Sequence, residues 1–179
     1  MTVDDAALLV RVTARVSAVL FAMSLFAGAR RLGARDAALL GAARRDDLAA
    51  FGVWIAAHSI HFAAVALLAF VTAGQNIRGA GGYLATLAVG LAFYAGSGAV
   101  VRVKARPSTG WTAAGQRRLE TGLAIVIWIV FIQAYARRAL QSPWFATLAI
   151  GLAAALAAFL MRARTSISSN MQGPSVRVS

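Results

Sequence analysis

Five apolar runs, each long enough to cross a lipid bilayer, constrain this sequence more than any other feature. A spanning helix needs about 20 apolar residues, because roughly 30 Å of hydrocarbon is crossed at about 1.5 Å per residue. Inside hydrocarbon the backbone must satisfy its own hydrogen bonds, which favours helices. The sequence therefore predicts an all-α polytopic membrane bundle of about five transmembrane helices, near residues 7–29, 48–73, 82–103, 119–135 and 144–161.

The composition supports the membrane interpretation and excludes several other classes of protein. The chain is 60% hydrophobic and 13% charged, whereas soluble domains are roughly 25% charged. The absence of cysteine excludes disulfides, iron–sulfur clusters and thiolate chemistry. The net charge of +12 comes from basic residues gathered between the apolar runs. We therefore expect contact with anionic membrane lipids and no nucleic-acid binding.

Basic residues concentrate in alternate connections between the apolar runs. The first connection carries Arg30, Arg31, Arg35, Arg44 and Arg45, and the third carries or adjoins Arg102, Lys104, Arg106, Arg117 and Arg118. Because Lys and Arg are enriched in cytoplasmic loops, this pattern predicts an outside N-terminus and an inside C-terminus in a bacterial inner membrane. Residues 1–165 are expected to form one bundle. Residues 166–179, rich in Ser and other small or polar residues, are expected to form a disordered cytoplasmic tail.

Four basic or titratable residues fall within the predicted spans, where an ionisable side chain costs about 3 kcal/mol. Arg11 and Arg15 are four residues apart, and His58 and His61 are three apart, so each pair shares one helix face. At about 1.5 Å per residue, both histidines, Arg15 and Gln133 lie roughly 15 to 21 Å from the inner surface. The sequence thus predicts a polar layer to which three helices contribute.

Two interpretations of this layer remain open. One is a hydrogen-bonded network, with His61 and Gln133 at its centre, that fixes helix packing and binds no ligand. The other is a pocket in which His58 or His61 binds a haem iron while Arg15 and Arg11 meet the propionates. Mononuclear zinc is disfavoured, because it usually takes three or four protein ligands. Glu120, the one acidic residue in the second half of the chain, is expected to form a local ion pair with the neighbouring Arg117 and Arg118.

Three blocks of sequence resemble a known family. The blocks are Thr13-Ala14-Arg15-Val16-Ser17; Arg44-Arg45 leading through Gly52 to His58-Ser59-Ile60-His61; and Arg117-Arg118-Leu119 followed by Gly122, Trp128, Phe131 and Tyr135. In these blocks the chain resembles the ferric reductase-like transmembrane family. Members of this family are small bacterial haem-binding membrane proteins, related to the membrane subunit of periplasmic methionine sulfoxide reductase. The resemblance covers most of the chain, from Thr13 to about Tyr135.

The resemblance implies a b-type haem that passes electrons across the membrane and is held by histidines on different helices. This chain departs from the family where a histidine is expected after a leucine, because it has Leu119-Glu120 there. His58 and His61 are about 60° apart on one helix and cannot grip both sides of one iron. Three outcomes remain open: a five-coordinate haem on one histidine, a haem shared across a homodimer, or a relative that has lost the cofactor.

The expected function is therefore that of an integral membrane b-type haem-binding electron-transfer component, an oxidoreductase component whose donor is a quinol or a separate redox protein. Gln133 would orient the second histidine. The alternative is a non-catalytic membrane subunit, or an assembly or partner-binding protein, that keeps the fold without the cofactor. The chain shows no Gly-rich dinucleotide fingerprint, so no flavin or nucleotide site is expected.

Overall fold

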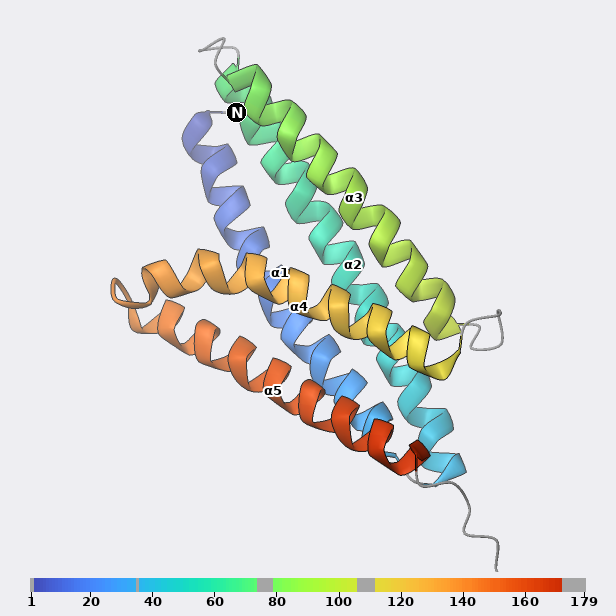
Figure 1. Ribbon diagram of the computed structural model, residues 1–179. Helices are drawn as coiled ribbons and strands as arrows, with labels where there is room; N and C mark the ends of the chain where they lie inside the picture. The colour runs from blue at the N-terminus through green and yellow to red at the C-terminus, as the bar shows by residue number, and fades with distance from the viewer. Residues whose placement is uncertain (1, 35, 74–78, 106–111, 172–179) are drawn as a thin grey trace, which may run out of the picture.

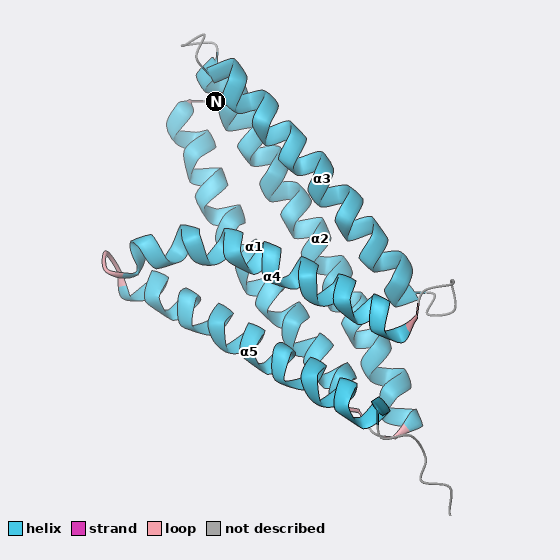
Figure 2. Cartoon of the chain, viewed as in Figure 1, coloured by secondary structure: helices cyan, strands magenta, loops and turns pink. Residues whose placement is uncertain are grey.

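The chain folds into five helices and, over the described residues, no strands (Figures 1 and 2). The computed structural model describes residues 2–34, 36–73, 79–105 and 112–171. The helices are α1 (Val3–Gly33), α2 (Ala37–Ala73), α3 (Gly79–Ala105), α4 (Ala113–Ala139) and α5 (Pro143–Met171). The predicted all-α bundle is confirmed.

Four of these helices, α1, α2, α4 and α5, are long and apolar enough to cross a membrane. In α3 the apolar stretch among the described residues, Ala88–Arg102, is shorter. Only 6% to 28% of the most apolar window of each of the four helices is buried inside the bundle. Large apolar side chains instead face outward, among them Met23, Phe70, Leu91, Val130 and Ile150. An apolar surface of this extent needs lipid around it, so the chain is a membrane protein.

The helices extend beyond the predicted spans at nearly every end. The predicted connection over residues 30–47 is mostly helical, because α1 continues to Gly33 and α2 begins at Ala37. The carboxylate of Asp36 accepts a hydrogen bond of 2.9 Å from the Ala38 N–H and so caps α2. At the other end of the chain α5 continues through Met171. Residues 166–171 of the predicted disordered tail thus continue α5, and residues 172–179 lie outside the described residues.

Helix α1 is central: it packs against both α2 and α5, while α3 packs along α2 and α4 along α5. In Figure 1 the α4–α5 pair lies at an angle to the other three helices, and α4 passes across α1 and α2. Pro143 begins α5, where its missing N–H leaves no hydrogen bond unmade. The indole N–H of Trp128 donates to the Leu152 carbonyl at 3.0 Å and joins α4 to α5.

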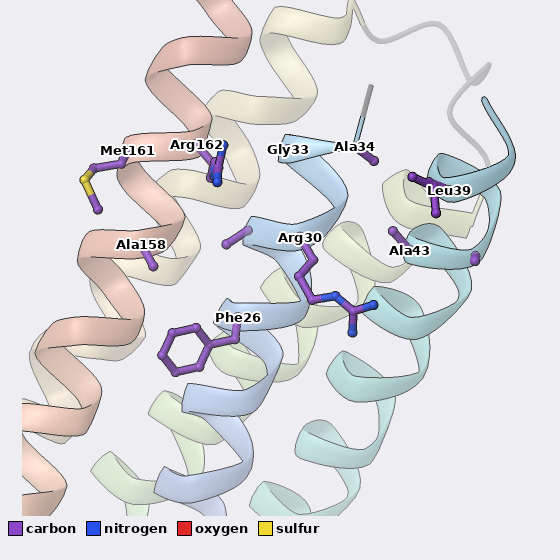
Figure 3. A pocket seen from close by; sticks show the side chains of 11 residues that line it. Phe26, Arg30, Gly33, Ala34, Leu39, Ala43, Ala158, Met161 and Arg162 are labelled. Carbon is purple, nitrogen blue, oxygen red and sulfur yellow. The ribbon is translucent and has the colours of Figure 1, made fainter. Parts of the chain in front are cut away.

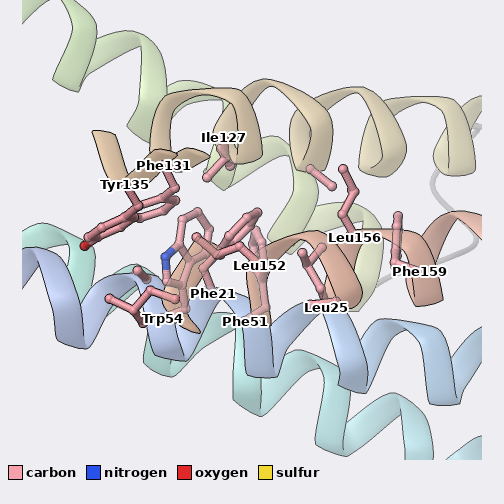
Figure 4. Packing of buried hydrophobic residues seen from close by; sticks show 14 of the residues in the cluster. Phe21, Leu25, Phe51, Trp54, Ile127, Phe131, Tyr135, Leu152, Leu156 and Phe159 are labelled. Atoms are coloured by element: carbon pink, nitrogen blue, oxygen red, sulfur yellow. The ribbon is translucent and has the colours of Figure 1, made fainter. Parts of the chain in front are cut away.

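The core is an aromatic cluster centred on Trp54, which is fully buried (Figure 4). Its ring centroid lies 5.0 Å from Phe21 on α1, 5.2 Å from Phe51 and 5.4 Å from Phe93 on α3. Phe131 on α4 stacks on Phe21 at 5.5 Å. Aromatic pairs of this kind contribute about 0.5–1.5 kcal/mol beyond the burial of their area. The cluster ties four helices together one turn away from the histidine pair.

Candidate functional site

The two histidines of α2 are each held by a hydroxyl group of α1. His58 Nδ1 lies 2.8 Å from the Ser17 hydroxyl, and His61 Nδ1 lies 3.0 Å from the Thr13 hydroxyl. Helices α1 and α2 are antiparallel here, because the earlier hydroxyl residue on α1 meets the later histidine on α2. The two hydroxyl residues are four apart in the chain, and the two histidines are three apart. The predicted pairing of the two histidines on one face is thus present, with α1 as its partner.

The hydrogen bonds of Thr13 and His61 are coupled. The Thr13 hydroxyl has one proton, and the backbone carbonyls of Leu9 and Val10 lie within hydrogen-bond distance of it, at 2.8 Å and 3.2 Å. When the hydroxyl donates to one of these carbonyls, it accepts a hydrogen bond from the Nδ1–H of His61, and the Nε2 atom of the neutral ring keeps its lone pair. This is the state in which histidine binds a metal, with the other nitrogen donating to a neighbouring group.

The surroundings of the two rings differ. The His58 ring packs at 4.4 Å from Phe93, 5.7 Å from Trp54 and 5.8 Å from Phe131, so it belongs to the aromatic core. His61 is one turn further along α2 and contacts the His58 ring at 5.7 Å. It is half-buried at the edge of the core. His58 is half-buried as well, so the two predicted ligands differ in their aromatic neighbours rather than in their burial class.

The predicted arginines lie in a neighbouring cavity rather than on the histidines. Arg11 and Arg15 line a cavity of about 540 Å³ that also includes Val10, which is three residues before Thr13. The Arg15 guanidinium lies 5.5 Å from the centre of the Phe145 ring. The lining residues Arg11 and Arg15 come two residues before and two residues after Thr13, so the cavity lies along the same turns of α1 as the His61–Thr13 hydrogen bond.

Gln133 does not join the layer in the way the sequence suggested. It is exposed on α4, and the hydrogen bonds that hold the histidine rings come from Thr13 and Ser17. Depth alone placed Gln133 beside the histidines, because rise along a helix says nothing about rotation around its axis. The hydroxyl partners had a signal in the sequence: Thr13 and Ser17 are four residues apart, as one face of a helix requires.

Glu120 is buried on α4 and forms an ion pair with another helix, whereas the sequence predicted a local pair with Arg117 and Arg118. Its partner is Arg31 of α1, at 2.5 Å, which sequence reasoning did not foresee. Arg31 also donates to Asp47 on α2 at 2.7 Å, and Lys104 on α3 donates to the same carboxylate at 2.6 Å. The position at which the resembled family carries a histidine is thus part of an ion network that joins four helices.

A second cavity, of about 780 Å³, lies at the other end of α1, between α1, α2 and α5 (Figure 3). Its walls are mostly apolar, with Phe26, Ala43 and Met161 among them, and Arg30 and Arg162 add charge. Arg30 is about 17 residues, or roughly 25 Å of helix, from Thr13. This cavity is therefore separate from the histidine site.

The ligand set of the described residues suits a haem better than a bare metal ion. Within that part of the chain, no group of three or more His, Cys, Asp or Glu side chains is placed to hold a metal. A haem macrocycle supplies the equatorial ligands of its iron and needs as few as one axial side chain. His61, whose Nδ1 is hydrogen-bonded to Thr13, is a candidate for such a side chain.

The chain matches no family model, no curated protein and no solved structure. The resemblance to the ferric reductase-like family therefore stays a prediction, and the chemistry of the site itself has to indicate the function.

Proposed function

We propose that this protein is a b-type haem-binding electron-transfer component of a bacterial inner membrane, of ferric reductase-like type, with His61 as the axial ligand. The observation that carries the proposal is the hydrogen-bond chain from His61 Nδ1 through the Thr13 hydroxyl to the Leu9 carbonyl. It leaves Nε2 as the ligating nitrogen and holds the ring in one orientation. The haem would supply a centre that accepts and releases one electron.

The protein's own groups have three tasks in this proposal. Thr13 orients the ligand ring, as outer-shell partners of metal-binding histidines do. His58, bonded to Ser17 and packed on Phe93, keeps water from the inner side of the site. Arg15 and Arg11, each two residues from Thr13 along α1, carry the positive charge that propionate groups require.

The proposal includes the predicted topology, with α3 as the fifth span and the N-terminus outside. Electrons would come from a quinol or from a separate redox protein, since the chain has no nucleotide-binding fingerprint. A homodimer is compatible with this scheme, because a second axial ligand would have to come from another chain.

Absorbance spectra test the proposal. Protein purified in detergent from haem-supplied cells is measured oxidised and after reduction with dithionite. We expect a reduced α-band at the position typical of b-type haem. His61→Ala should abolish the band, and the matched variant His58→Ala should keep it. Absence of a band in the wild-type protein would overturn the haem proposal, whereas loss in His58→Ala alone would move the ligand to His58.

A second candidate is a non-catalytic subunit that binds a partner protein in the membrane. Two observations favour it: Glu120 stands at the family's histidine position and is held by Arg31, and aromatic rings already fill the space around His58. In that case the purified protein would show no haem spectrum. Removing the His61 ring would then change only the stability of the α1–α2 packing.

A further inference from the structure

The cavity beside the histidine site collects positive charge without an acidic partner. It lies between the N-terminal half of α1, the C-terminal end of α4 and the start of α5, and Leu68 of α2 closes it. Three arginines line it: Arg11, Arg15 and Arg138. None of the ion pairs found among the described residues includes any of the three. The charge of this cavity is therefore uncompensated within the described part of the chain.

A single aromatic ring holds two of these arginines. The guanidinium of Arg15 lies 5.5 Å from the centre of the Phe145 ring, and that of Arg138 lies 5.9 Å from the same centre. The ring face attracts each cation, but two like charges held near one ring repel each other, and more strongly where water is scarce. An anion between them would remove this repulsion.

A buried tyrosine belongs to the lining of the same cavity. Tyr135 lines the cavity, is only 3% exposed and stacks on Phe145 with 6.1 Å between ring centres. Among the described residues its buried hydroxyl has no hydrogen-bond partner. A buried phenol without a partner is costly, and most are paired. An oxyanion in the cavity would accept a hydrogen bond from it.

Apart from Gln141, the remaining lining is apolar and determines the other half of the ligand's chemistry. Val10, Ala14, Leu68 and Ala134 contribute hydrocarbon walls to the cavity. Its volume, about 540 Å³, is within the range of roughly 300–1,000 Å³ that small-molecule sites occupy. A ligand that satisfies all of these groups has an apolar body and an oxyanion at one end.

We propose that this cavity binds the phosphate or carboxylate end of an amphipathic ligand, with Arg15, Arg138 and Tyr135 as its contacts. Guanidinium groups bind both oxyanions through paired, charge-assisted hydrogen bonds. The ligand has two sources: the head group of an anionic phospholipid, or the propionates of a haem. The phospholipid source is independent of the proposed function, and the haem source rests on it.

The experiment compares arginine variants that differ by one position. Both arginines are exposed, but Arg138→Gln removes a residue that lines the cavity, and Arg137→Gln removes its neighbour, which does not. Each protein is purified with a mixture of phosphatidylglycerol and phosphatidylcholine, and native mass spectrometry counts the lipids retained. We expect Arg138→Gln and Arg15→Gln to lose selectivity for phosphatidylglycerol by about tenfold, and Tyr135→Phe by less, since one charge-assisted hydrogen bond contributes about 1.5–3 kcal/mol.

A second arm measures haem binding to the same variants by titration of the absorbance band. Weaker haem binding in Arg138→Gln but not in Arg137→Gln would identify the propionates as the ligand. Lost lipid selectivity without an effect on haem would identify the phospholipid. His61→Ala separates the two proposals, because it should abolish haem binding while leaving lipid retention unchanged. Equal behaviour of Arg138→Gln and Arg137→Gln in both arms would overturn the cavity proposal.

Discussion

Arg31 on α1 and Glu120 on α4 are 89 residues apart in the chain, yet their side chains meet at 2.5 Å inside the bundle. Arg31 also donates to Asp47, which Lys104 contacts as well, so two basic and two acidic side chains from four helices balance one another. Buried charges are tolerated in hydrocarbon when they are paired in this way. The network explains how α4 can carry an acidic residue at a buried position.

Removing one member of this network should destabilise the protein strongly. We expect Glu120→Ala to lower the free energy of unfolding by about 3–5 kcal/mol, because it leaves the buried Arg31 charge only partly compensated. Thermal unfolding in detergent measures the loss.

The exposed ion pair between Arg30 and Asp46, at 3.7 Å, provides the matched control. Asp46→Ala should change stability by no more than about 1 kcal/mol, since exposed pairs contribute little. Equal losses in Glu120→Ala and Asp46→Ala would show that Glu120 is not held as described.

A histidine introduced at position 120, where the resembled family has one, should not act as a haem ligand. Glu120 is held beside Arg31, which is 14 residues from Ser17, the partner of His58. That separation corresponds to about 21 Å along α1. In haem-loaded protein we expect Glu120→His to leave the ligation state unchanged while lowering stability. Electron paramagnetic resonance of the oxidised protein tests this, and a new low-spin signal with two imidazole ligands would contradict the placement of Glu120.

Removing the hydroxyl group of Thr13 should weaken haem binding through His61, whereas removing a hydroxyl that bonds only within its own helix should not. Thr13→Val keeps the shape of the side chain but removes the acceptor for His61 Nδ1–H. We expect a loss of about 1 kcal/mol in stability and, in haem-loaded protein, roughly 10- to 100-fold weaker binding of the cofactor.

Thr147→Val is the comparison, because the Thr147 hydroxyl is exposed and bonds back to the Pro143 carbonyl of its own helix. It should leave haem binding unchanged. Haem titration measures the affinity of both variants. An unchanged haem affinity in Thr13→Val would argue against His61 as the ligand.

Close contact between α2 and α3 depends on the absence of a side chain at Gly90. A Cβ atom there would overlap the ring of Phe62 on α2. We expect Gly90→Ala to cost about 1–3 kcal/mol, as overpacking usually does, because the ring has to move away. At Gly98, on the same helix, an added Cβ would meet nothing within 4 Å. Gly98→Ala should therefore be neutral or slightly stabilising, and comparing the thermal unfolding of the two variants checks the packing of α3.

The sequence by itself determined that the chain is a bundle of helices in a membrane. Long apolar runs leave the backbone no other way to satisfy its hydrogen bonds in hydrocarbon, and this requirement acts within each segment alone. The shared face of His58 and His61 follows equally from their spacing, because i and i+3 are neighbours on any helix.

Only the tertiary structure decided which groups these residues meet. Thr13 rather than Gln133 bonds His61, and Arg31 from α1 pairs with Glu120. Arg138 and Tyr135 also join Arg15 around one cavity. The depth of a residue can be counted along its own helix. Its partner depends on how each helix is rotated and crossed, which the packing of side chains from distant segments determines.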